Sequence, residues 1–215
     1  DLFLVNGAAQ EAYCRRQFPE ARSEPKAVGL AFLDRVAAEQ TPSACVTMRR
    51  RLGIEDGRRL FVYVLNSARD YRFPQYHRES LANMTIERRV AALFARNPGA
   101  DLILKLYGGG IDGAPLRGFI RSLGAPNIRI LETPAFSKML PAADAFIADF
   151  PSTTTCEMAL TDKPIFFVNA LTAIEWLPEA REIMGRRAVF METLEEIDST
   201  LGRALAAERL EPNPD

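Results

Sequence analysis

The amino-acid sequence predicts an α/β protein built around a doubly wound, parallel sheet. Short apolar runs rich in Val, Ile, Leu and Phe recur along the whole chain, and amphipathic stretches of helix length separate them. The runs do not alternate with polar residues, which is typical of strands buried on both faces. Strand–helix alternation at this spacing implies right-handed βαβ units, with helices on both faces of the sheet.

Eight apolar runs are candidate strands. They are residues 2–6, 27–29, 60–65, 101–106, 128–131, 145–149, 164–168 and 188–190. Between two of them, residues 78–97 carry an apolar stripe of 3.6-residue period formed by Ile86, Val90, Leu93 and Phe94. The dipeptide Pro98-Gly99 then predicts the end of that helix. The last segment repeats the pattern with Leu194, Ile197, Leu201 and Leu205, so we expect a helix there too.

A polar stretch of small residues at 37–43 marks a domain boundary. The strand–helix–strand segment before it is too short to bury a core of its own. We therefore expect residues 1–41 to be the end of a first Rossmann-like domain and its linker. Residues 42–215 are expected to form a self-sufficient Rossmann-like domain with six strands. Because the chain opens directly on a strand-like run without Met, we interpret it as a fragment of a longer protein.

Composition excludes several classes of protein. The formal net charge is −1, from 27 basic and 28 acidic residues, so a general nucleic-acid binder is not expected. The three cysteines are scattered and lack metal-ligand spacing, which disfavours a disulfide framework or a metal site and suits a reducing cytoplasm. No apolar run approaches the ~20 residues of a membrane helix. We expect no cofactor.

Four hydroxyl residues follow the candidate strand 145–149 and open the next helix. Ligands of open α/β sheets bind beyond the carboxyl ends of the strands. The free amides at the start of this helix, with the hydroxyls of Ser152, Thr153 and Thr154, suit a phosphate. Glu157 lies about one turn further and can accept hydrogen bonds from a ribose. The alternative is that the hydroxyls only cap the helix and that Glu157 is a solvated helix residue.

Two further strands end in residues able to contact an anion. Ser67 and Arg69 follow the candidate strand 60–65, where a small side chain leaves room and a guanidinium can pair with a diphosphate. The alternative is a surface loop. Lys105 ends the next strand, before three consecutive glycines, and is interpreted either as a phosphate contact or as a side chain that extends its ammonium into solvent.

The loop after residues 128–131 is a candidate base-binding segment. Phe136 can stack on a base while backbone groups of Thr133 and Pro134 recognise its edge; the alternative is that Phe136 belongs to the core. His77, the one histidine, is more typical of an exposed side chain than of a general base. A serine hydrolase is disfavoured because no GxSxG motif occurs.

With these loops identified, the chain resembles the C-terminal, donor-binding half of GT-B-fold transferases. It is most similar to CDP-glycerol glycerophosphotransferase-like and capsule-polysaccharide enzymes, and more distantly to UDP-N-acetylglucosamine 2-epimerase. Three stretches carry the resemblance: residues 144–167, residues 26–34, and residues 101–107 at the place of an IKLHP motif. The chain departs from that last motif, because Tyr107-Gly108 replaces His-Pro.

The resemblance implies that Ser152, Thr153 and Thr154 hold donor phosphates and that Glu157 contacts the ribose. It implies a transferase that moves a sugar or polyol phosphate from a CDP- or UDP-linked donor to a polysaccharide or lipid-linked acceptor. The location would be cytoplasmic, with peripheral membrane association through other regions left open. The fragment alone is expected to bind nucleotide without turnover. Two alternatives remain: an epimerase of the same architecture, and a non-catalytic interaction domain that retains the fold.

Overall fold

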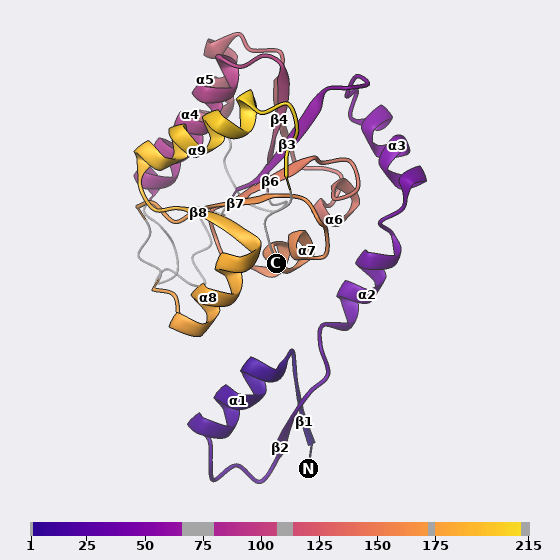
Figure 1. Cartoon of the computed structure of the whole chain (residues 1–215), viewed down its shortest axis with the longest axis vertical. Coiled ribbons are helices and arrows are strands. Elements are labelled where there is room, and N and C mark those ends of the chain that lie inside the picture. Colours follow the sequence, from indigo (N-terminus) through magenta and orange to yellow (C-terminus); the bar gives the residue numbers. More distant parts are fainter. Residues whose placement is uncertain (1, 66–79, 107–113, 172–174, 212–215) are drawn as a thin grey trace. The chain divides into compact units, whose positions relative to one another are not determined.

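The computed structural model describes residues 2–65, 80–106, 114–171 and 175–211, and the chain divides into two compact units, Asp1–Gln40 and Thr41–Asp215. Each unit is described by itself below (Figure 1). The sequence features at Ser67, Arg69, His77 and Tyr107-Gly108 lie outside the described residues.

The first unit is a small βαβ element followed by a helix. It contains β1 (Leu2–Val5), α1 (Ala8–Gln17), β2 (Glu24–Ala27) and α2 (Ala31–Ala38). The strands β1 and β2 pair in parallel. The strand predicted at residues 27–29 therefore lies three residues earlier, because the pairing ends at Val5 opposite Ala27 and Gly29 turns the backbone to φ 79°. The apolar side chains of Leu2, Phe3 and Leu4 are more than half exposed.

The second unit contains a six-stranded parallel sheet. Its strands are β3 (Arg59–Val64), β4 (Ala100–Lys105), β5 (Ile128–Leu131), β6 (Ala145–Ala148), β7 (Ile165–Val168) and β8 (Ala188–Met191). Its helices are α3 (Pro42–Arg51), α4 (Ser80–Ala95), α5 (Ala114–Leu123), α6 (Phe136–Met139), α7 (Thr153–Ala159), α8 (Pro178–Arg187) and α9 (Leu194–Ala206). The strand order is β5-β4-β3-β6-β7-β8. Counted from β3, this is the Rossmann order, and the predicted fold class is confirmed.

Helices cover both faces of this sheet (Figure 1). On one face α4, α5 and α9 form a core with side chains that alternate along the strands, such as Phe61 and Tyr63 of β3. The predicted apolar stripes of α4 and α9 both face this core, and Ile86 and Ile197 have no exposed surface. On the other face, Phe136 of α6 packs edge-to-face on Phe146 of β6.

Charged side chains at the amino ends of the strands pair with one another. The Asp144 carboxylate accepts hydrogen bonds from the backbone N–H of Leu60 (2.7 Å) and from Arg49 (3.0 Å). Arg58 forms an ion pair of 2.7 Å with Asp101. We call Arg49, Arg58, Asp101 and Asp144 the amino-edge network. It connects α3, β3, β4 and β6 at the amino ends of the strands.

Candidate functional site

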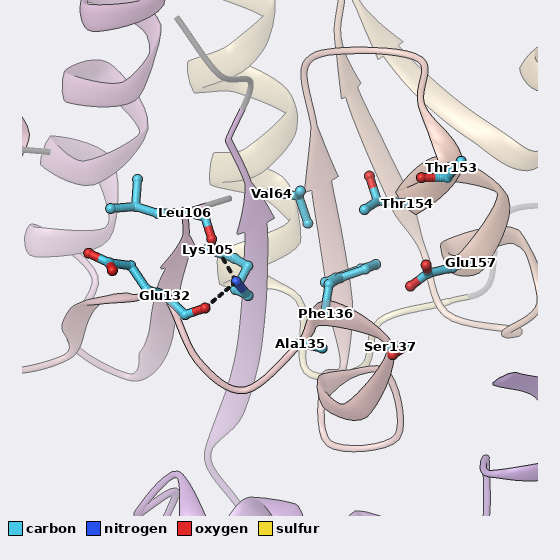
Figure 2. Close-up of a pocket in the computed structure, with 10 residues that line it drawn as sticks. All are labelled: Val64, Lys105, Leu106, Glu132, Ala135, Phe136, Ser137, Thr153, Thr154 and Glu157. Atoms are coloured by element: carbon cyan, nitrogen blue, oxygen red, sulfur yellow. Dashed lines mark hydrogen bonds between the residues drawn. The ribbon is translucent and has the colours of Figure 1, made fainter. Parts of the chain in front are cut away.

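A cavity of about 280 Å³ opens at the carboxyl ends of β3, β4 and β5. Its walls come from three strand ends, from α6 with the residue before it, and from α7 (Figure 2). The lining residues are Val64, Lys105, Leu106, Glu132, Ala135, Phe136, Ser137, Thr153, Thr154 and Glu157.

The strand order explains why a cavity forms at this place. From β3 the chain proceeds outward to β4 and β5, and then returns to the other side of β3 to form β6. The strands that follow β3 and β6 in the chain therefore lie on opposite sides of this pair, which makes β3 and β6 the switch point of the sheet. Open α/β sheets bind their ligands at such a switch point, beyond the carboxyl ends of the strands.

The start of α7 is held by its own hydroxyl groups. Pro151 precedes the extended Ser152, where the helix begins. The buried Thr155 hydroxyl accepts the backbone N–H of Ser152 (3.2 Å) and donates to the carbonyl of Phe150 (3.2 Å). Ser152 and Thr154 share a hydrogen bond of 2.7 Å between their hydroxyls. The first amides of a helix have no intrahelical acceptor, and here the first two helical residues, Thr153 and Thr154, line the cavity.

Glu157 is the polar group of this cavity with an unsatisfied atom. Its Oε2 is buried and has no hydrogen-bond partner among the residues that the structure describes. Burial raises the pKa of the Glu157 carboxyl above its usual value of 4.5. Glu157 is therefore not a solvated helix residue, because it places a desolvated acceptor beside the cavity. A donor from a bound ligand would remove the cost of that unpaired oxygen.

Lys105 is the one cation among the described residues that line the cavity. Its side chain is 5% exposed, and Nζ donates to the backbone carbonyls of Leu106 (2.6 Å) and Glu132 (2.8 Å). Burial lowers the pKa of this ammonium, and the nearby Glu132 opposes that shift. The ammonium does not extend into solvent, so one of the two interpretations of Lys105 is excluded.

The structure brings part of the predicted site together. Lys105, Phe136, Thr153, Thr154 and Glu157 line one cavity, although they come from three separate strand–loop connections. Thr133, Pro134 and Ser152 lie next to lining residues in the chain but do not line the cavity themselves. Phe136 is 7% exposed and packs on Phe146, so its ring is largely a core side chain with one side toward the cavity.

Five lining residues were not among the predicted site residues: Val64, Leu106, Glu132, Ala135 and Ser137. Val64 ends β3, while Leu106 and Glu132 directly follow β4 and β5. A rule that takes the last residue of each predicted strand and the first residue after it would have found Leu106 and Glu132, but not Val64, because the predicted strand 60–65 extends one residue beyond β3. Ala135 and Ser137 flank Phe136 and would have been found by extending that prediction by one residue on each side.

The cavity can bind a ligand that carries both hydroxyl groups and anionic oxygens. Glu157 supplies an acceptor for hydroxyls, while Thr153 and Thr154 supply hydroxyl and backbone donors at a helix start. Within the described parts of the chain, no group of three or more His, Cys, Asp or Glu side chains could hold a metal ion. No helix built from those residues has the length and apolar character to span a membrane.

No protein-family model and no curated protein sequence matches the chain. Solved structures do match its fold. WaaG, a glycosyltransferase involved in lipopolysaccharide biosynthesis, aligns over 95% of this chain and 53% of its own, with 17% identity and a TM-score of 0.60.

Two other glycosyl- or polymer-forming enzymes match similarly. The wall teichoic acid polymerase TagF covers 96% of this chain and 52% of its own, with 11% identity and a TM-score of 0.55. The pneumococcal O-GlcNAc transferase GtfA, solved in complex with UDP and GlcNAc, covers 95% of this chain and 37% of its own, with 13% identity and a TM-score of 0.53. The chain spans about half the length of the first structures that it matches. At these identities the likeness establishes the Rossmann-like fold of GT-B glycosyltransferases.

Proposed function

We propose that the unit Thr41–Asp215 binds the nucleotide of an activated donor for a GT-B-type glycosyl or polyol-phosphate transferase. The observation that carries the proposal is the cavity at the β3/β6 switch point, with the unpartnered Glu157 oxygen in its wall. A nucleoside diphosphate has ribose hydroxyls to donate to that oxygen and phosphate oxygens to accept from the start of α7. UDP, which is bound in the structure of GtfA, has both groups.

The proposed contacts combine residues that line the cavity with predicted residues next to them in the chain. Glu157 receives the ribose hydroxyls, while Ser152, Thr153 and Thr154 receive the phosphates. The segment Thr133–Phe136 contacts the base, with Thr133 and Pro134 acting through their backbone. Ser67 and Arg69, which lie outside the described residues, are proposed as further phosphate contacts. Fixed donors at the leaving phosphate would stabilise the charge that develops as the donor bond breaks.

The donor is proposed to be CDP- or UDP-linked and the acceptor a cell-surface polysaccharide or a lipid-linked precursor in the cytoplasm. The fold match to TagF supports this class of transferase, and the motif resemblance of residues 144–167 is its second support. The exposed Leu2, Phe3 and Leu4 support the proposal that residues 1–41 end a preceding Rossmann-like domain, since parallel strands are normally covered on both faces. That domain would supply the general base.

Titration calorimetry with CDP, UDP and CMP tests the nucleotide site on this chain. We expect heat of binding from at least one of the three, and a roughly tenfold weaker affinity in Glu157→Ala, the loss that corresponds to about 1.4 kcal/mol. Glu182→Ala is the matched control, because Glu182 is an exposed helix carboxylate of α8 that forms an ion pair with Arg186 and does not line the cavity. Absence of heat from all three nucleotides at millimolar concentration would refute the site.

A further inference from the structure

The side chain of Lys105 connects the end of β4 with the end of β5, at the point where the pairing of these two strands ends. The pairing of β4 with β5 ends at Lys105 opposite Leu131, and the last ladder hydrogen bond runs from the N–H of Leu106 to the carbonyl of Leu131. Beyond it, the Lys105 ammonium donates to the carbonyls of Leu106 and Glu132, one from each segment (Figure 2). Lys105 thus continues the connection between β4 and β5 by one residue after the ladder has ended.

A cation in this position is costly, which argues that it has a specific role. The side chain is 5% exposed and its charge is desolvated. A methionine has a similar length and would fill the space without that cost. What methionine lacks is the ability to donate to the carbonyls of Leu106 and Glu132.

The segment that Lys105 holds is a wall of the cavity. Glu132, whose carbonyl it binds, opens the connection that supplies Ala135, Phe136 and Ser137 to the lining. Glu132 also forms an exposed ion pair with Arg117, which contributes little to its position. Lys105 therefore holds the start of residues 132–137, while Phe136 holds their end through its packing on Phe146.

We propose that Lys105 is a positioning residue that fixes the cavity wall formed by residues 132–137, and that it acts on the ligand through this main chain and not as a phosphate contact. The effect on ligands rests on the proposed nucleotide site, but the effect on the wall does not. A positioning role weakens every ligand that touches the wall by the same factor. A direct phosphate contact weakens only the phosphorylated ligands.

Lys105→Met removes the donor and keeps the length of the side chain. We expect amide hydrogen exchange at Lys138, whose N–H donates to the carbonyl of Ala135 in this wall, to become faster by roughly tenfold, because two hydrogen bonds from a charged group are lost. Affinities for cytidine, CMP and CDP (or the uridine series, if that is what binds) should fall by one common factor, so that the ratio of CDP to cytidine affinity stays as in the wild type. Lys105→Gln keeps a donor, so its exchange rate and its affinities should lie between those of the wild type and those of Lys105→Met. It also guards against the case in which Lys105→Met fails to fold.

Lys163→Met is the matched control. Lys163 is also a desolvated lysine, and its Nζ donates to the carbonyls of Leu140 (2.6 Å) and Pro141 (2.9 Å), but it does not line the cavity. We expect faster exchange at Ala142 and Ala143, after α6, and unchanged exchange at Lys138 in this variant.

Two results would overturn the proposal. One is unchanged exchange at Lys138 in Lys105→Met, and the other is a selective loss of affinity for CDP over cytidine. If the wild type binds none of these ligands, the nucleotide site fails, while the exchange experiment still decides whether Lys105 positions the wall.

Discussion

The amino ends and the carboxyl ends of the strands in the six-stranded sheet differ in how their charged side chains are paired. We call these two sides of the sheet the amino edge and the carboxyl edge. At the amino edge, the amino-edge network satisfies its charges internally: Asp144 binds Arg49 and the Leu60 amide, and Arg58 binds Asp101. At the carboxyl edge, the Glu157 carboxyl keeps a buried oxygen without a described partner, beside a cavity. Polar groups that are satisfied by one another stabilise a fold, whereas an unsatisfied one is costly and indicates a place for a ligand. The comparison predicts that substitutions at the first edge change stability and that substitutions at the second change binding.

The largest expected effect is on stability at the amino edge. Asp144→Ala leaves Arg49 and the Leu60 amide without their shared acceptor. We expect the free energy of unfolding to fall by about 2 kcal/mol, measured by urea denaturation, because hydrogen bonds to a charged group are lost at a partly buried site. Nucleotide affinity should remain at the wild-type value. A variant as stable as the wild type but weaker in binding would contradict the assignment of the two edges.

Arg59 offers a second test at the amino edge. Its guanidinium donates to the carbonyls of Ala204, Leu205 and Ala207 at the end of α9, where a cation also interacts favourably with the helix dipole. We expect Arg59→Met to lower the free energy of unfolding by about 1.5 kcal/mol. Hydrogen exchange should become faster in the last turn of α9, with no change in ligand affinity. Faster exchange around α7 instead would show that the two edges are coupled.

Two helix starts at the carboxyl edge allow a matched comparison, because α7 follows β6 and lines the cavity, whereas α9 follows β8 and does not. Thr155 holds the start of α7 beside the cavity, and the Thr193 hydroxyl accepts the Glu196 amide at the start of α9. Thr155→Val and Thr193→Ala should each lower the free energy of unfolding by about 1 kcal/mol, as other losses of helix caps do. Only Thr155→Val should weaken CDP or UDP in calorimetry, since only that helix start lines the cavity. Equal losses of affinity in the two variants would show that nucleotide affinity follows the overall stability of the protein and not the start of α7.

The smallest expected effect is a pH dependence from Glu157. The folded state raises the pKa of its carboxyl above 4.5, so the folded protein binds more protons than the unfolded chain in the interval between the two values. Stability from this group is therefore fully present below pH 4.5 and is lost as the pH rises through the folded pKa. The difference in unfolding free energy between Glu157→Gln and the wild type should grow in favour of the variant over that interval. If this difference shrinks as the pH rises, folding lowers the pKa of Glu157 instead of raising it, and the carboxyl is not desolvated.

Much of the fold could be predicted because its signal is local. The stripe of Ile86, Val90 and Phe94 follows from helix geometry, and the uninterrupted apolar strands follow from a sheet covered on both faces. The strand at Glu24–Ala27 was misplaced by three residues because its exposed residues carry no such pattern and its limits depend on pairing with β1. In the site, Thr153, Thr154 and Glu157 could be predicted from their place after a strand. The partners of Lys105 could not, because they depend on how β4 and β5 separate.

The sequence by itself determined the alternation of strands and helices along the chain and the domain with six strands. It also determined the strand ends at which ligand-binding residues could lie. These features depend on side-chain periodicity and on turn residues that act within a few positions. The tertiary structure alone decided which of those strand ends meet, that Glu157 is desolvated and that the Lys105 ammonium is bound by two carbonyls. Burial and hydrogen-bond satisfaction belong to contacts between segments far apart in the chain, such as Lys105 with Glu132, and no local pattern encodes them.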